Sequence, residues 1–231
     1  MTHLTTMTTD EYFGDWLRVI DKEELDKVVG VAYNLYQTKL VVPAYEDIFK
    51  AFTLCTLHDC KVVFLGQDPY PQKGVATGIL FGNREGTELS PSLEVIKEAC
   101  INFERPHNYP ITFDQTLESW GRQGILLINS ALTCEMNRIG SHTMLWRPFI
   151  SKLVYNISKY DSSIIFVLFG SQAATFEPYI KSHYVMKVQH PAYFARMGQK
   201  MPYSVFTDLN KLLVGLYGEP IQWYEEYNQL N

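Results

Sequence analysis

The 231 residues suffice for one α/β domain, and 46% hydrophobic against 19% charged residues allows a sizeable core and excludes a disordered chain. The net charge of −5 argues against a protein that coats nucleic acid without specificity. The four cysteines form no CxxC pair and the six histidines form no HxH or HxxxH pair, so we predict neither a metal nor a cofactor.

Helical patterns and short apolar runs alternate along the chain. Two helices are predicted over residues 9–39, and further helices over 44–55, 91–103, 112–124, 143–160, 171–182 and 202–217. Buried strands are predicted at 61–66, 124–129, 163–170 and 184–189, because each is a short, nearly continuous apolar run. This order predicts an α/β fold of three layers, α/β/α, with a central, mainly parallel four-stranded sheet flanked by helices.

The chain contains no repeat and no linker, so we expect a single domain over residues 1–231. Within it, residues 1–60 form an N-terminal helical region and residues 61–217 the α/β core. The first residues, MTHLTTMTTDEYF, have neither the basic start nor the apolar stretch of a signal peptide, and no apolar run approaches a membrane span. We expect a soluble cytoplasmic protein with reduced cysteines that does not bind membranes.

Polar residues follow the end of each predicted strand. They are Gln67, Asp68, Tyr70, Asn129, Ser171 and His190. Each has an ordinary structural explanation by itself, as a helix cap, a turn residue or a loop histidine. Because ligands of parallel sheets bind beyond the carboxyl ends of the strands, their common position predicts a functional site.

Several kinds of chemistry are excluded by missing motifs. There is no GxSxG, no GxGxxG after the first strand and no GxxxxGK[ST], which removes the hydrolase triad, dinucleotide and P-loop interpretations. Asp68 and His190 remain as an acid/base pair. The Asn129 amide carries a donor and an acceptor in one plane and can therefore read the edge of a planar heterocycle.

Six motifs, in order from about residue 60 to 210, resemble the motif series of the uracil-DNA glycosylases: GQDPYP, SPSL, LLINSALT, GSHTMLW, FVLFGSQ and HPAYF. The resemblance implies cleavage of the N-glycosidic bond of uracil in single- or double-stranded DNA, after the nucleotide has been flipped out of the duplex. It implies that Asp68 positions the attacking water and stabilises a cationic sugar. His190 then donates a hydrogen bond to the uracil oxygen beside the leaving nitrogen.

The resemblance also implies the residues that recognise the base. Asn129 reads the uracil edge and distinguishes it from cytosine, and Tyr70 crowds the C5 position and excludes thymine. Phe81 stacks on the flipped base, and Gln67 adds contacts from the loop.

The remaining motifs imply contacts with DNA outside the base. These residues are Ser90, Pro91, Ser92, Ser171, Pro191, Phe194 and Arg196. The SPS sequence suits the first turn of a helix, whose free N–H groups favour phosphate, although ordinary capping explains the serines equally well. Between Glu177 and Asp208 there are lysines and arginines but no acidic residue, which supports a DNA face in this part of the chain.

The segment after His190 departs from the family. The usual HPSPLS, whose Leu enters the base stack, is HPAYFA here, so Phe194 takes the wedge position and Ala192 replaces a phosphate-contacting Ser. Pro71 and Thr77 stand where histidines are common, and Phe169 where Trp is usual.

Two alternatives stay open beside a uracil glycosylase. One is a catalytically weak or inactive module that binds DNA or a partner on the same fold. The other is a glycosylase for a different pyrimidine, which Tyr70 opposes because a thymine-accepting pocket needs a smaller residue. The family resemblance favours a monomer and adds a phage-type inhibitor protein that mimics DNA as a candidate partner.

Overall fold

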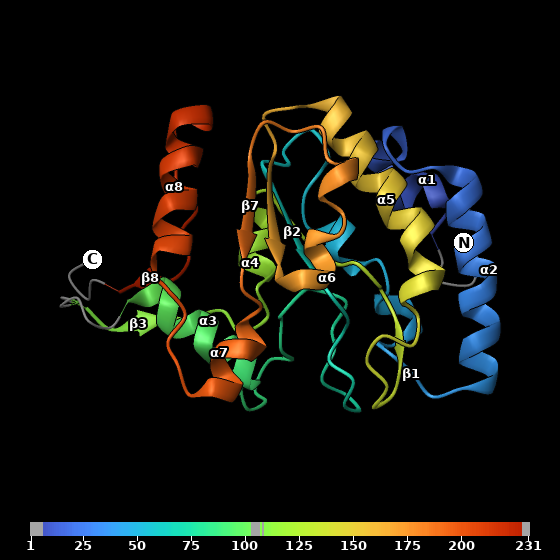
Figure 1. The fold of residues 1–231 in the computed structure, drawn as a ribbon, viewed down its shortest axis with the longest axis horizontal. Helices are drawn as coiled ribbons and strands as arrows, with labels where there is room; N and C mark the ends of the chain where they lie inside the picture. Colours follow the sequence, from blue (N-terminus) through green and yellow to red (C-terminus); the bar gives the residue numbers. More distant parts are fainter. Residues whose placement is uncertain (1–6, 103–106, 108, 228–231) are drawn as a thin grey trace.

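A four-stranded parallel sheet forms the centre of the molecule (Figure 1). The structure is a computed structural model that describes residues 7–102, 107 and 109–227. The strand order is β4-β2-β6-β7, with β2 at Val62–Gly66, β4 at Ile125–Asn129, β6 at Ile165–Phe169 and β7 at Val185–Val188. The four predicted strands and the α/β class are confirmed.

Strands β2, β4 and β6 are buried at every position, because both faces of the sheet are covered. Successive side chains of a strand point to opposite faces. In β2, Val63 and Leu65 enter one core cluster, and Val62 and Phe64 enter the other. This explains why the strands read as continuous apolar runs rather than as alternating ones.

Two layers of helices enclose the sheet (Figure 1). One face carries α1 (Thr9–Phe13), α2 (Lys22–Thr38) and α5 (Thr143–Tyr160), and the other carries α3 (Pro91–Ile101), α4 (Glu118–Arg122) and α8 (Ser204–Tyr217). In α5 the buried residues recur at helical spacing, which fixes the face that packs on the sheet. No helix within the described residues is long and apolar enough to cross a membrane.

The predicted helix over 44–55 is wrong. The segment forms two short 3₁₀ helices, η2 (Tyr45–Asp47) and η3 (Lys50–Thr53), and a third 3₁₀ helix, η1 (Gly14–Arg18), lies between α1 and α2. The turn at Asp47 meets the chain at Gly78, where an added Cβ would lie 1.8 Å from the Asp47 carbonyl oxygen. This close backbone packing is a tertiary contact that local periodicity does not reveal.

Other predicted helices are shorter than expected. In the segment 112–124 only α4 is helical, because Asp114 accepts hydrogen bonds from the backbone N–H groups of Thr116 and Ser119 and forms a turn. The segment 171–182 divides into α6 (Gly170–Ala174) and the 3₁₀ helix η4 (Glu177–Tyr179). Pro178 lies in the first turn of η4, where a proline is tolerated. Residue 103, the last of a predicted helix, lies outside the described residues.

Some elements were not predicted. Helix α7 (Pro191–Met197) occupies the segment expected to be a loop, and it has Pro191 at its first position and Gly198 just after its end. Two small antiparallel sheets pair β1 (Val41–Val42) with β5 (Cys134–Glu135), and β3 (Ile111–Thr112) with β8 (Glu225–Glu226). Strands of two residues are too short to leave a periodic signal.

Candidate active site

A cavity of about 490 Å³ opens beside the carboxyl ends of the strands. These strand ends lie at the lower edge of the sheet in Figure 1. This volume lies in the range of sites for small molecules, about 300–1,000 Å³. The predicted site residues that line it are Gln67, Asp68, Tyr70, Phe81, Ser92, Asn129, Ser171, His190 and Arg196. Four predicted residues, Ser90, Pro91, Pro191 and Phe194, are not among its lining residues.

The loops after β2 and β4 are joined by hydrogen bonds. The N–H of Ser130 donates to the Gly66 carbonyl at 3.0 Å, and the N–H of Ala131 donates to the Gln67 carbonyl at 3.0 Å. Gly66 and Asn129 are register partners, and a Cβ at Gly66 would lie 2.8 Å from Asn129 Oδ1. Glycine is therefore required at position 66 for the amide to occupy this place.

Asp68 is held by the backbone of a distant loop. The N–H of Gly140 donates to Asp68 Oδ2 at 3.2 Å, whereas Asp68 Oδ1 is buried and has no partner within the structure. Burial raises the pKa of Asp68 to about 6, although the Gly140 N–H and the Gln67 side chain oppose the shift. The carboxylate is thus ionised above that pH, and its Oδ1 is available to accept a hydrogen bond from a ligand.

His190 is the N-cap of α7, and its Nδ1 accepts a hydrogen bond from the Ala192 N–H at 3.1 Å. In a neutral ring this contact assigns the proton to Nε2. Burial, and then the positive charge of Arg196, lowers the pKa of His190, so the neutral ring is favoured. Gly170 lies against His190: its φ is +88°, and a Cβ there would lie 3.0 Å from the Cβ of His190. A glycine at this position therefore leaves room for the histidine. Burial and the Ala192 contact together favour a neutral ring with its proton on Nε2.

Asn129 is 9% exposed, and its Oδ1 is buried without a hydrogen-bond partner among the described residues. A buried polar atom without a partner is costly, and such atoms cluster where a ligand completes the bonding. Asn129 is the last residue of β4, a strand that is buried throughout, so the position of its amide is well defined. The orphaned oxygen is therefore available to accept a hydrogen bond from a ligand.

Tyr70 and Phe81 form the aromatic part of the cavity. The Tyr70 hydroxyl donates to the Phe81 carbonyl at 3.0 Å, and the Phe81 ring packs edge-on against Phe169 at 5.1 Å and His190 at 5.6 Å. Phe81 has a φ of +63°, which is strained for a residue with a bulky side chain. The strain is tolerated where the surroundings fix the backbone, which is common at binding sites.

Helix α7 places its two aromatic residues differently. Tyr193 lines the cavity, whereas Phe194 is half-buried and packs against the core cluster that includes residues of α3. The two rings meet edge-on at 5.5 Å. Tyr193 is a cavity residue that was not predicted from the sequence. Pro191 and Gly198 are typical of the two ends of a helix, and they were the signal that Tyr193 and Phe194 point in different directions.

The Gly140 N–H was also missed, because a backbone donor has no side-chain signature. The loop that carries it is closed by a 2.8 Å ion pair between Glu135 and Arg138, and by a hydrogen bond from the Asn137 N–H to the Pro71 carbonyl at 2.9 Å. It therefore lies against the loop that follows β2. Only the tertiary structure shows that this loop belongs to the site.

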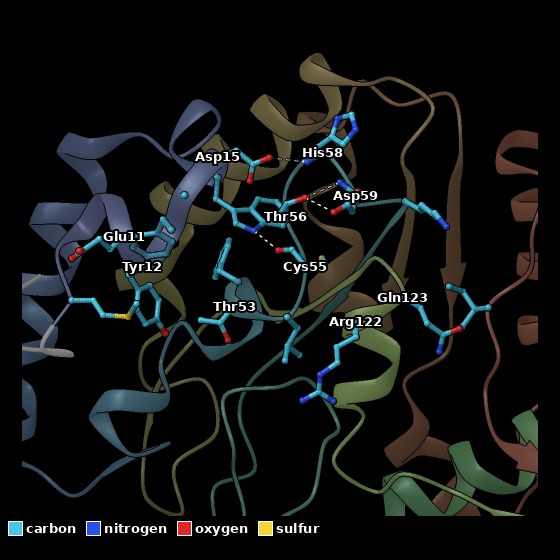
Figure 2. Close-up of a pocket in the computed structure, with 18 of the residues that line it drawn as sticks. Glu11, Tyr12, Asp15, Thr53, Cys55, Thr56, His58, Asp59, Arg122 and Gln123 are labelled. Carbon is cyan, nitrogen blue, oxygen red and sulfur yellow. Dashed lines mark hydrogen bonds between the residues drawn. The ribbon is translucent and has the colours of Figure 1, made fainter.

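A larger pocket, of about 1,230 Å³, lies at the opposite edge of the sheet, where Lys61 and Gln123 precede β2 and β4 (Figure 2). Its polar groups bond to one another. Asp15 accepts from the backbone N–H of His58 at 2.9 Å, and the Thr56 hydroxyl donates to Asp59 at 2.7 Å. Because these groups are satisfied within the fold, the smaller cavity is the candidate active site.

The described part of the chain holds no group of three or more His, Cys, Asp or Glu side chains that could bind a metal ion. The cavity instead combines a carboxylate, a neutral imidazole and an amide with aromatic rings. Fold and site together define an α/β protein with a pocket suited to a flat, polar-edged ring.

Comparison with known proteins identifies the class. Residues 52–214 match the family described as the uracil DNA glycosylase superfamily. The chain is 34% identical over 218 residues to the uracil-DNA glycosylase of Buchnera aphidicola, covering 93% of this chain and 92% of that protein. It is also 34% identical over 221 residues to the uracil-DNA glycosylase of Yersinia pseudotuberculosis, covering 90% and 94%.

Solved structures agree with this result. A mimivirus UNG variant in complex with UGI superposes with a TM-score of 0.72 at 25% identity, covering 94% of each chain. A mimivirus uracil-DNA glycosylase has a TM-score of 0.70 at 22% identity, which shows the shared fold. The chain belongs to the uracil DNA glycosylase superfamily.

Proposed function

We propose that this protein is a uracil-DNA glycosylase of base-excision repair, which hydrolyses the N-glycosidic bond and leaves free uracil and an abasic site. The observation that carries the proposal is the convergence of Asp68, Asn129 and His190, from the ends of three strands, on one cavity. The curated relatives, 34% identical over almost the whole chain, support the same activity.

Uracil enters the cavity after its nucleotide leaves the base stack. Extrusion costs a few kcal/mol, which stacking and edge hydrogen bonds offset. Phe81 supplies the stacking surface, and the unpartnered Oδ1 of Asn129 accepts the N3–H of uracil while its amide N–H donates to the adjacent oxygen. Cytosine presents an acceptor where uracil presents the N3–H, and it is rejected because buried groups are left unpaired.

Asp68 and His190 act on opposite ends of the breaking bond. The C1′–N1 bond of the nucleotide lengthens, and its electrons pass to the uracil ring. The Nε2–H of His190 donates to the uracil oxygen that gains charge, so a neutral donor stabilises the leaving anion. The Asp68 carboxylate stabilises the cationic sugar, orients water toward C1′ and accepts its proton.

The pH dependence of the reaction follows from Asp68. Its pKa of about 6 means that the carboxylate becomes protonated as the pH falls through this value. We expect kcat/KM to rise from about pH 5 to a plateau above about pH 7. Burial, and then the charge of Arg196, lowers the pKa of His190 and so favours the neutral ring. A profile that stays flat down to pH 4.5 would show that Asp68 titrates as an ordinary carboxyl group.

The DNA backbone lies along the rim of the cavity in this proposal. Ser92, Ser171 and Arg196 line the cavity, and Arg196 is exposed. Neutralisation of phosphates by such side chains releases counterions, so binding weakens as the salt concentration rises. Pro91 and Pro191 begin α3 and α7 and orient the helix N-termini at this rim.

The protein would act as one monomeric domain. Its four cysteines are free, as is usual in a reducing compartment, and we place the enzyme in the cytoplasm. A DNA-mimicking inhibitor of the kind called UGI is a candidate partner, because a mimivirus homologue forms such a complex.

The aromatic residues of α7 are proposed to support the distorted duplex, with Phe194 as the wedge. Phe194→Ala is expected to reduce uracil release from duplex DNA about tenfold more than from single strands, since only a duplex has to be opened. Tyr193→Ala is the matched comparison, because Tyr193 lies on the cavity side. Steady-state rates on both substrates test this, and equal losses for Phe194→Ala would remove its role as a wedge.

A single-turnover assay with uracil-containing single- and double-stranded oligonucleotides tests the main proposal. Alkaline cleavage at the abasic site reports the product, and matched oligonucleotides with cytosine serve as the control. Release of uracil alone is the expected result. If DNA binds but no abasic product forms, the protein is instead a binding module on the same fold.

A further inference from the structure

Ser90 lies outside the cavity lining, but its hydroxyl reaches a residue of the base pocket. Ser90 Oγ donates to the Tyr70 hydroxyl at 2.6 Å, and it accepts the Leu93 N–H at 3.3 Å as the N-cap of α3. Asn83 Oδ1 lies 3.1 Å from the same oxygen. The hydroxyl is thus already bonded inside the protein, through both its proton and its lone pairs.

Tyr70 links Ser90 to the stacking residue. Its hydroxyl accepts from Ser90 and donates to the Phe81 carbonyl, so both of its bonding capacities are used. Burial raises the pKa of Tyr70 well above its ordinary value, which keeps the phenol protonated as a donor. The chain of bonds runs from the start of α3 through Tyr70 to the strained backbone at Phe81.

We propose that Ser90 is a positioning residue for thymine exclusion, which holds the Tyr70 ring where the methyl group of thymine would lie. A ring attached only through Cβ can turn about its side-chain torsions, whereas a hydroxyl held from two sides cannot move without breaking a bond. The inference rests on the proposed excision of uracil. It assigns part of the enzyme's selectivity for uracil over thymine to Ser90, a residue outside the cavity lining.

This role differs from the phosphate contact predicted from the sequence. A phosphate oxygen would need the Ser90 proton that Tyr70 accepts at 2.6 Å. Ser92 and Ser171 line the cavity and supply hydroxyl groups for the backbone instead. Loss of Ser90 should therefore change the choice of base more than the affinity for DNA.

The test compares uracil and thymine release by Ser90→Ala and Ser90→Gly. Single-stranded oligonucleotides that differ only in the target base are used, so that duplex stability does not enter. Glycine is tolerated at an N-cap at little cost, so the second variant keeps the helix while it removes the hydroxyl. We expect thymine release, relative to uracil release, to rise about tenfold, which corresponds to the loss of one buried hydrogen bond.

Ser92→Ala is the matched control, since it removes a serine hydroxyl from the same turn of α3. It is expected to weaken DNA binding and leave the ratio of thymine to uracil release at the wild-type value. Ser90→Thr should restore that ratio, because the hydroxyl returns. Thermal melting confirms that each variant is folded.

A double-mutant comparison removes the same bond from its other end. Tyr70→Phe keeps the ring but loses the hydroxyl, so adding Ser90→Ala to it should change the ratio no further. The proposal would be overturned if the effects of Ser90→Ala and Tyr70→Phe on the ratio of thymine to uracil release multiplied in the double mutant. It would also be overturned if the Ser90 variants bound DNA poorly but kept the wild-type ratio. Wild-type protein that releases no uracil would refute the proposed function itself, which is a separate result.

Discussion

Asp68→Asn is expected to lower the rate of uracil release by about 10²–10⁴-fold while DNA binding is largely retained. Asparagine keeps the shape of the side chain and can still accept the Gly140 N–H, but it has no negative charge for the cationic sugar and takes no proton from water. Single-turnover rates give the chemical step, and titration of uracil-containing DNA gives the affinity.

The same substitution has a stability effect of predictable sign. Asp68 has a higher pKa in the folded protein than in the unfolded chain, so the folded state binds more protons between about pH 4 and pH 6. Stability contributed by this group therefore falls as the pH rises through that window. Asp68→Asn should melt at a higher temperature than the wild type at pH 8, and the difference should vanish near pH 4.

The stability result also controls for folding, since a stabilised protein with a much lower rate has lost chemistry rather than structure. Residues placed at active sites often cost stability in this way. Loss of DNA binding in proportion to the loss of rate would contradict the assigned role of Asp68. It would then be a binding residue.

Tyr70→Ala is expected to convert a uracil-specific pocket into one that also accepts thymine. The truncation removes the ring beside the base, so that the extra methyl group of thymine no longer meets an obstacle. It also removes the hydrogen bond to Phe81, so the cavity loosens and uracil release should fall about tenfold. Tyr70 is partly buried, so the loss of its ring costs up to about 3 kcal/mol of stability, and assays belong at 25 °C or below.

Thymine release from single-stranded DNA, measured as abasic product, is the deciding measurement for this variant. Tyr70→Phe is the comparison, because it keeps the ring and loses only the hydroxyl. It should release less thymine than Tyr70→Ala. Undetectable thymine release by Tyr70→Ala would leave the exclusion of thymine without a steric basis at this position.

Sequence patterns were most informative where burial dominates. Strands β2, β4 and β6 are buried at every residue, and strands covered on both faces are composed of nearly continuous apolar residues. The polar residues at the ends of these strands and after β7 therefore indicated the edge where Asp68, Asn129 and His190 meet. Helices were predicted less well where capping or tertiary contacts divide them, as at Asp47 beside Gly78.

The sequence by itself determined the α/β class, the four strands and the residue types that gather at the candidate site, because residue type and strand order suffice for these. The tertiary structure alone decided that the Gly140 N–H holds Asp68, that Tyr193 rather than Phe194 lines the cavity, and that Ser90 bonds to Tyr70. The Gly140–Asp68 and Ser90–Tyr70 contacts join segments whose relative position depends on the packing of the whole fold. The choice between Tyr193 and Phe194 depends on the rotation of the short helix α7. The local sequence predicts neither the packing of distant segments nor the rotation of a short helix.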